Sequence, residues 1–155
     1  MAITEILLDR RAPDRMYAGG DWREAASGRR FVVRNPATGD ILTEVAEAGE
    51  ADVDAAVGAA REAYESGPWA RLDAADRGTL LWKIGDALEA RAEALTRLEV
   101  LDNGKPLREA KIDLMHVVDT FRYYAGWTTK LEGETIPVRG NVFNYTLREP
   151  VGVVG

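Results

Sequence analysis

Residues 146–155 read TLREPVGVVG, and this stretch decides the fold class. Its last five residues, Val151 to Gly155, are apolar throughout and follow a proline. A short, wholly apolar run is typical of a strand buried inside a parallel sheet, with strands on both edges and helices on both faces. The sequence therefore predicts an α/β protein in which residues 151–155 form the first strand of a larger sheet.

The segment before this strand, NVFNYTLRE at residues 141–149, alternates in polarity. Phe143, Tyr145 and Leu147 fall on one side, and mostly polar residues fall on the other. This period of two predicts a half-buried strand.

The middle of the chain predicts helices. One apolar stripe runs through residues 50–66 and ends at Gly67-Pro68. Asp73 has the character of an N-cap, and the following helix breaks near Arg91 and closes at Asn103-Gly104. Its expected buried face consists of Leu80, Leu81, Ile84 and Leu88.

The next helix, predicted from Pro106 to Leu131, has two largely non-polar stripes. One stripe contains Leu114, Val118 and Phe121; the other contains Ile112, His116, Thr120, Tyr123 and Trp127. At 100° per residue the two stripes lie about 200° apart. We expect such a helix to be covered on both sides.

Ahead of the helices, residues 16–46 predict short strands. Gly19-Gly20 and residues 35–39 supply turn chemistry between them. Residues 1–15 are expected to be a flexible lead-in.

Composition excludes several classes of protein. The 155 residues carry a net charge of −6, with acids and bases mixed along the chain, which argues against binding to nucleic acid or to anionic membranes. No run approaches the length of a membrane span, and the N-terminus lacks a secretory pattern. A cytoplasmic protein is the default expectation. Cysteine is absent, which excludes thiol nucleophiles and zinc-thiolate sites in this chain.

Few residues carry obvious chemistry. Neither G-x-x-x-x-G-K-[ST] nor G-x-G-x-x-G occurs. A lone histidine on a helix, here His116, is more often a packed or surface residue than a catalyst. Asp102 falls at a helix C-terminus, where a carboxylate is unfavourable. Either a hydrogen bond to the Asn103-Gly104 turn or a bound cation would explain it.

Four segments together resemble the N-terminal part of the aldehyde dehydrogenase superfamily. They are VVRNPATGDILTEVAEAGEADVDAAVGAAREAY, LEVLDNGKP, RYYAGWTTKLEGETIPV and TLREPVGVVG, in the family's order and at its spacing. The likeness runs from about residue 16 to residue 155. It implies an α/β fold with short strands, about four helices, oligomerisation arm strands and the first strand of a Rossmann-like coenzyme domain, truncated there.

The resemblance also implies a division of the chain. Residues 16–135 correspond to the N-terminal part of the coenzyme-binding domain, residues 136–150 to an oligomerisation arm, and residues 151–155 to the first strand of the dinucleotide-binding sheet. The arm implies a homo-oligomer, a dimer or a tetramer, in which this strand pairs with another subunit.

The implied activity is oxidation of a small aldehyde to a carboxylate with NAD or NADP, through a cysteine thiohemiacetal. In the family the catalytic and cofactor-binding residues lie downstream of the strand at 151–155. This chain alone is therefore expected to be inactive and to bind no cofactor.

The resemblance transfers two pairs of residues. Ile112 and His116 match positions that line the substrate tunnel. Arg34, through its backbone carbonyl, and Asp102, through its carboxylate, match the ligands of a structural monovalent cation in some members.

A second hypothesis is a standalone, non-catalytic interaction module. Such a module would dock on full-length aldehyde dehydrogenase subunits through the strand at residues 141–149. Size-exclusion chromatography with and without a full-length homologue separates the two hypotheses.

Overall fold

The computed structural model describes residues 14–155. Most of the predicted lead-in, residues 1–13, lies outside the described residues. Short strands come first, as the sequence predicts: β1 (Met16–Ala18), β2 (Asp21–Arg23), β3 (Arg30–Arg34) and β4 (Ile41–Ala46). Helices follow: α2 (Glu50–Ser66), the 3-10 helix η1 (Pro68–Arg71), α3 (Ala74–Glu89), α4 (Ala92–Asn103) and α5 (Leu107–Trp127).

The strands form two separate antiparallel hairpins. β1 pairs with β2, and β3 pairs with β4 with a register shift at Arg34. Arg30 of β3 ties the hairpins together, because its guanidinium contacts the carboxylates of Asp14 and Glu24 and the Glu44 carbonyl. The hydrogen bond from Arg30 holds the pKa of Asp14 below its ordinary value.

Helix α2 begins and ends where the sequence predicts. The Asp52 carboxylate accepts hydrogen bonds from the backbone N–H groups of Gly49 and Ala26, each at 2.9 Å. The first bond satisfies a donor at the helix start, and the second fixes the loop before β3 to the helix. These two bonds lower the pKa of Asp52.

Helices α3 and α5 lie against each other along a seam of small residues. Gly78 and Gly85 of α3 are buried, and they face Ala125 and Val118 of α5. A Cβ at Gly78 would lie 2.8 Å from the Ala125 carbonyl oxygen, and one at Gly85 would lie 3.6 Å from that of Val118. The glycines therefore set how closely the helices approach.

The predicted buried face of α3 is only half right. Leu80 and Ile84 are exposed, at 38% and 41%. Leu81 and Leu88 are half-buried, and their spacing places them on the same side of the helix as Gly78 and Gly85, which packs on α5.

Helix α4 confirms the predicted break and stop. It starts after the turn at Ala90–Arg91 and ends at Gly104, whose φ of 80° is the left-handed conformation that closes a helix. Gly104 also lies against Pro36 of the β3–β4 turn, so close that a Cβ would be 2.8 Å from its Cγ.

Helix α5 ends at Trp127, earlier than the predicted Leu131. Its buried residues are Ala110, Val118 and Ala125, which belong to the side that meets α3 and α4. The second apolar stripe, expected to be covered, is exposed. Tyr123 is 60% exposed and Trp127 40%.

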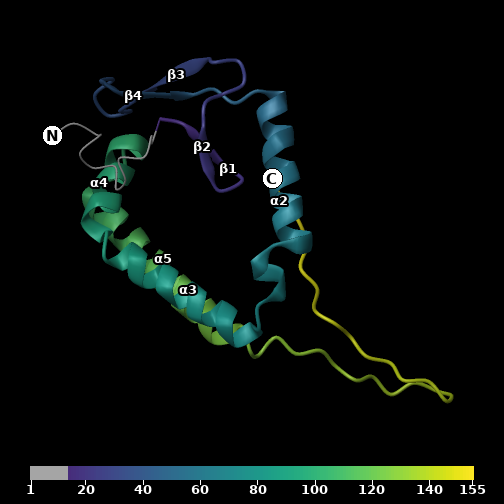
Figure 1. Cartoon of the computed structure of the whole chain (residues 1–155). Helices are drawn as coiled ribbons and strands as arrows, with labels where there is room; N and C mark the ends of the chain where they lie inside the picture. Colours follow the sequence, from purple (N-terminus) through teal and green to yellow (C-terminus); the bar gives the residue numbers. More distant parts are fainter. Residues whose placement is uncertain (1–13) are drawn as a thin grey trace.

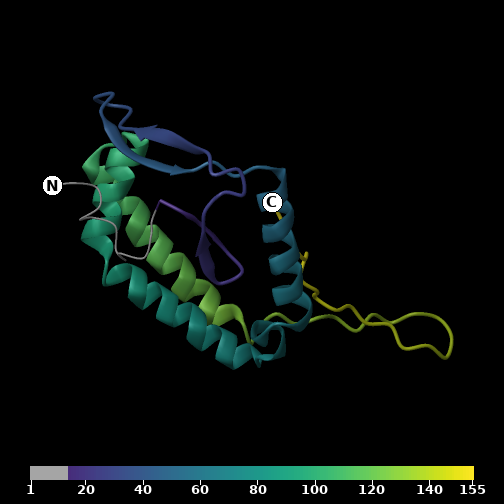
Figure 2. The same ribbon diagram turned by 45° about the horizontal axis from the view of Figure 1, so that its top comes forward.

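Residues 129–155 form an extended ribbon that runs out from the helices and then returns to the side of α2 (Figures 1 and 2). Its two limbs meet at the bridge Thr135–Tyr145, flanked by hydrogen bonds from Ile136 N–H to Asn144 and from Thr146 N–H to Glu134. The predicted half-burial of residues 141–149 is wrong here, since Phe143 is 77% exposed. No described segment covers this face.

Residues 151–155 form no strand in the structure, contrary to the expectation from their apolar pattern. Val151 is 93% exposed. The reason is physical, because a strand requires a hydrogen-bonded neighbour and no described segment lies beside this one in a ladder.

The chain is an open arch with little core. Helices α3, α4 and α5 form one side, α2 forms the other, and the hairpins connect them (Figures 1 and 2). Its accessible surface is 11,727 Å², whereas a compact monomer of 17.0 kDa exposes about 7,700 Å². Among the described residues, no large side chain is fully buried. No helix in residues 14–155 has the length and apolarity to cross a bilayer.

Candidate functional site

Ile112 and His116, the candidate tunnel residues, lie one turn apart on the exposed side of α5. Ile112 is 37% exposed, and His116 is exposed as well. The Thr120 hydroxyl donates a hydrogen bond of 2.7 Å to the His116 backbone carbonyl, and this bond holds the Thr120 side chain against the helix. The imidazole stands between two shallow depressions of about 430 and 500 Å³.

Aromatic side chains extend this surface toward the end of α5. Tyr123 meets Tyr124 edge-on, with ring centroids 5.2 Å apart, and lies 6.1 Å from the Trp127 ring. Tyr123 and Tyr124 also line the first depression beside His116. The arrangement is a mostly apolar wall with one imidazole, and it suits contact with an organic molecule or with another part of a protein.

Arg34 and Asp102, the candidate cation ligands, belong to two segments that meet. Arg34 ends β3, just before the turn whose Pro36 packs on Gly104 at the end of α4. Asp102 lies in the last turn of α4 and is exposed. The Arg34 guanidinium donates to the Gly39 carbonyl at 3.0 Å, within its own hairpin turn. Residues 14–155 contain no cluster of three metal-ligating side chains.

Lys105 fixes the loop between α4 and α5, a role that sequence reasoning missed. Its ammonium lies 2.7 Å from the Glu99 carboxylate and 2.8 Å from that of Asp113. Hydrogen bonds to Asp113 and Glu99 raise the pKa of Lys105. The sequence did offer a signal for this role, because one acid, Glu99, precedes the lysine and another, Asp113, follows it.

Arg122 is a second residue that the sequence did not single out. Its guanidinium crosses from α5 to α3, where it contacts the carboxylates of Asp86 and Glu89. It also lies over the Trp82 ring, 5.5 Å from its centroid. The hydrogen bonds to Glu89 and Asp86 raise the pKa of Arg122. The pattern is structural, since it joins two helices.

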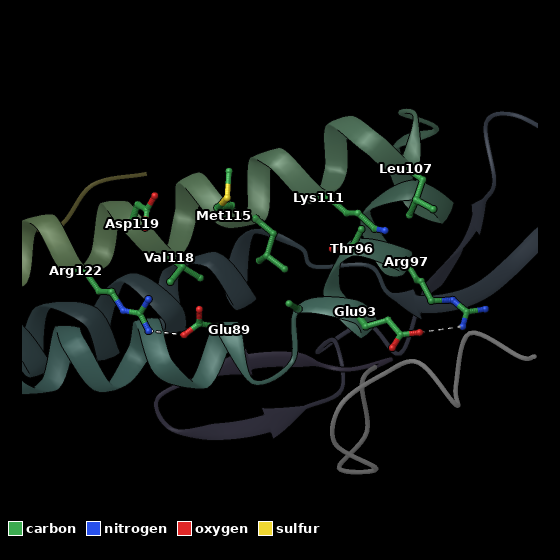
Figure 3. Close-up of a pocket in the computed structure, with 12 residues that line it drawn as sticks. Glu89, Glu93, Thr96, Arg97, Leu107, Lys111, Met115, Val118, Asp119 and Arg122 are labelled. Atoms are coloured by element: carbon green, nitrogen blue, oxygen red, sulfur yellow. Dashed lines mark hydrogen bonds and ion pairs between the residues drawn. The ribbon is translucent and has the colours of Figure 1, made fainter.

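A groove of about 770 Å³ lies between α4 and α5 (Figure 3). Leu107, Leu114, Met115 and Val118 supply apolar lining, and charged side chains from the three helices stand around it. It contains none of the four residues that the sequence singled out.

The described residues offer no fit for a dinucleotide. In residues 151–155, Val151 and Val154 are exposed, and the segment neither forms a strand nor leads into a helix in the described chain, so it presents no helix N-terminus to a pyrophosphate. No step of a reaction can be assigned to a cofactor held by these residues.

The family model described as "Aldehyde dehydrogenase family" matches residues 22–155. This chain belongs to the aldehyde dehydrogenase family.

Individual relatives are similar over nearly the whole chain. The putative aldehyde dehydrogenase DhaS of Bacillus subtilis (strain 168) is 48% identical over 142 residues, 91% of this chain and 29% of the relative. Retinal dehydrogenase 2 of Homo sapiens is 48% identical over 143 residues, covering 91% and 28%. The chain thus spans somewhat under a third of the length of these relatives.

Solved structures support the same fold. The NAD+ complex of an aldehyde dehydrogenase from Bacillus cereus superposes with a TM-score of 0.83 at 49% identity, over 88% of this chain and 28% of that one. A betaine aldehyde dehydrogenase from Staphylococcus aureus superposes with a TM-score of 0.80 at 35% identity, over 88% and 27%.

Proposed function

We propose that this chain is the N-terminal part of an NAD(P)-dependent aldehyde dehydrogenase that oxidises a small aldehyde to a carboxylate. The observation that carries the proposal is the family match over residues 22–155. Similarity to a solved NAD+ complex supports NAD as the first cofactor to test.

The proposed division of labour leaves no catalytic step to residues 14–155. Their main part is to support a coenzyme domain and an oligomer. The open arch and its excess exposed surface support this view, because such a surface is stable only when other protein covers it.

We place Ile112 and His116 on the wall of the aldehyde tunnel in the complete enzyme. Their exposure on a continuous aromatic face of α5 supports that position. An imidazole there offers a hydrogen bond to a polar aldehyde. Arg34 and Asp102 are the proposed ligands of a monovalent cation, supported by the contact between Pro36 and Gly104 that brings their segments together.

Residues 136–150 are the proposed oligomerisation arm of a dimer or tetramer. The ribbon has unpaired edges and exposed apolar side chains, as expected of a strand that pairs with another subunit. We further propose a cytoplasmic location, with no nucleic acid or membrane as partner, on the balance of charge.

The deciding experiment compares two proteins. The product of the complete reading frame that contains this sequence is assayed for aldehyde-dependent formation of NADH and NADPH, beside the 155-residue chain alone. We expect activity only from the former. If the complete product binds neither cofactor and oxidises no aldehyde, the proposal is wrong.

A matched substitution tests the tunnel position. In the active protein, His116→Leu is expected to lower kcat/KM for polar aldehydes relative to aliphatic ones, by roughly tenfold if one hydrogen bond is lost. The control is Lys111→Leu, at the position immediately before Ile112. An unchanged ratio for both variants contradicts the assignment.

A further inference from the structure

Lys105 bridges two helices through a pair of carboxylates. Its ammonium lies 2.7 Å from the Glu99 carboxylate of α4 and 2.8 Å from the Asp113 carboxylate of α5. The Lys105 side chain is 23% exposed, whereas the other lysines of the chain are exposed residues. Because both bonds join full charges at hydrogen-bonding distance, they are of the stronger kind and hold the two carboxylates in place.

The backbone on both sides of Lys105 is fixed. Gly104 has a φ of 80° and lies against Pro36 of the β3–β4 turn. Pro106, whose ring restricts its own φ, begins the first turn of α5. The direction in which the Lys105 side chain leaves the loop is therefore set by these contacts.

Asp113 lies between two hollows of the surface. On one side it lines, together with Glu99, a hollow of about 280 Å³ beside α4. On the other side it lines the depression of about 500 Å³ that also contains His116. Asp113 precedes His116 by three positions, so the two side chains are neighbours on the helix surface. The partner of the Asp113 carboxylate therefore decides which hollow carries its negative charge.

Lys105 holds this charge on the side of α4. Its ammonium contacts Glu99 of α4 at the same time as Asp113, so the Asp113 carboxylate is paired at the α4 edge. Without the ammonium, Asp113 would be an unpaired anion within one helix turn of His116. Such a charge acts more strongly on a ligand in a hollow than in open water, because a protein surface screens charge less than bulk solvent does.

We propose that Lys105 is a positioning residue that keeps the tunnel wall at Ile112 and His116 free of unpaired negative charge. Lys105 acts through Asp113 and thereby lets the enzyme accept anionic aldehydes. The inference rests on the proposed function, since it requires that this face of α5 lines the aldehyde tunnel.

Kinetics of the complete, active protein test the proposal with two aldehydes of equal carbon number, neutral butanal and anionic succinate semialdehyde. Lys105→Met should raise KM for succinate semialdehyde relative to KM for butanal by roughly threefold, because the released carboxylate repels the anion. The ratio of the two kcat values should stay unchanged, since the charge acts on binding and not on the chemical step. Lys105→Arg should restore the wild-type KM ratio. The control Lys111→Met removes an exposed lysine of the same helix and should leave the ratio unchanged.

A double-mutant cycle separates this role from the loss of a merely structural contact. When Asp113→Asn is already present, no carboxylate remains to be released, so adding Lys105→Met should leave the KM ratio unchanged. A wild-type KM ratio in Lys105→Met would overturn the proposal. An equal shift of the ratio with and without Asp113→Asn would also overturn it.

Amine labelling of the complete protein tests the Lys105–Asp113 contact without reference to activity. Lys105 should react with acetic anhydride more slowly than the exposed Lys111, and Asp113→Asn should raise the rate at Lys105 by roughly threefold, as measured by peptide mass spectrometry. Asp119→Asn, an exposed acid of the same helix, is the control.

The labelling result distinguishes failure of this inference from failure of the proposed function. An unchanged rate at Lys105 in Asp113→Asn would overturn the inference, even in a protein that oxidises aldehydes. If the rate rises but the complete protein oxidises no aldehyde, the proposed function is wrong and the specificity role falls with it, while the contact itself stands.

Discussion

Arg122 joins α5 to α3, the helix against which α5 packs. It makes two carboxylate contacts on α3 and lies over Trp82, while its aliphatic part meets the backbone at Gly85, 3.4 Å from the position of a Cβ. A lysine cannot reproduce this set, because an ammonium has neither the planar fork nor the flat face of a guanidinium.

Replacement of Arg122 should therefore lower stability in a graded manner. Arg122→Met leaves Asp86 and Glu89 as neighbouring like charges and should lower Tm more than Arg122→Lys does. Thermal unfolding followed by circular dichroism measures both. Arg108→Met is the control, since that side chain is 85% exposed and, within residues 14–155, pairs with the adjacent Glu109 alone. Equal Tm values for the three variants would show that the Arg122 contacts contribute nothing.

Gly78 limits the approach of α3 to α5. An added methyl group would lie 2.7 Å from Thr128 Oγ1 and 2.8 Å from the Ala125 carbonyl oxygen. Gly78→Ala should therefore destabilise the fold by about 1–3 kcal/mol, as measured by urea denaturation. Gly58→Ala is the matched control in α2, where no atom lies within 4 Å, and it should stabilise by about 0.5–1 kcal/mol. A stabilising Gly78→Ala would contradict the tight seam.

At the scale of elements, Asp52 connects α2 to the loop before β3. Its two backbone hydrogen bonds hold the pKa of the carboxyl below its ordinary value of 3.8. Since the folded-state pKa lies below the unfolded one, this contribution is fully present above about pH 3.8. It is lost as the pH falls through the folded-state value.

Asp52→Ala should therefore raise amide exchange at Ala26 and in the first turn of α2 at neutral pH. The wild type should reach the same exchange only in acid. Asp54→Ala, an exposed acid in the same helix, is the control and should leave Ala26 unchanged. If acid leaves the Ala26 amide of the wild type protected, the linkage is wrong.

Most helix boundaries were predictable because local chemistry determines them; the end of α5, at Trp127 and not at Leu131, was the exception. Gly67-Pro68, Asp73, Arg91 and Gly104 each mark an end that the structure confirms. The packing face of α3 was predicted only in part, since hydrophobicity indicated Leu81 and Leu88 correctly but gave no signal for Gly78 and Gly85, which make the close approach. A residue without a side chain gives no apolar signal, although it can form the tightest contact.

At the scale of the whole molecule, the exposed surface exceeds that of a compact monomer of this mass by about 4,000 Å² (11,727 minus about 7,700). For residues 141–149 and 151–155 the sequence shows which side chains are apolar, but the prediction that these side chains are buried is wrong in this structure. Polarity belongs to the sequence, whereas burial depends on neighbours that these residues lack here. For the same reason, the tunnel and cation assignments stay predictions.

The isolated 155-residue chain should unfold with weak cooperativity. Its buried apolar residues among those described are Ala25, Ala46, Ala110, Val118 and Ala125, which are all small or medium-sized. Differential scanning calorimetry should show a broad transition of low enthalpy, with binding of a hydrophobic dye before melting. A sharp two-state peak with no dye binding would contradict this expectation.

The seam between α3 and α5 also restricts how this gene segment can change in length. Gly78 and Gly85 lie seven positions apart in the sequence, as do the facing Val118 and Ala125. One inserted codon between the glycines would rotate Gly85 by about 100° and place a bulkier neighbour against α5. Insertions and deletions should be tolerated better at the tip of the ribbon, where a Cβ at Gly140 would meet no atom within 4 Å. Between the two glycines they should be rejected.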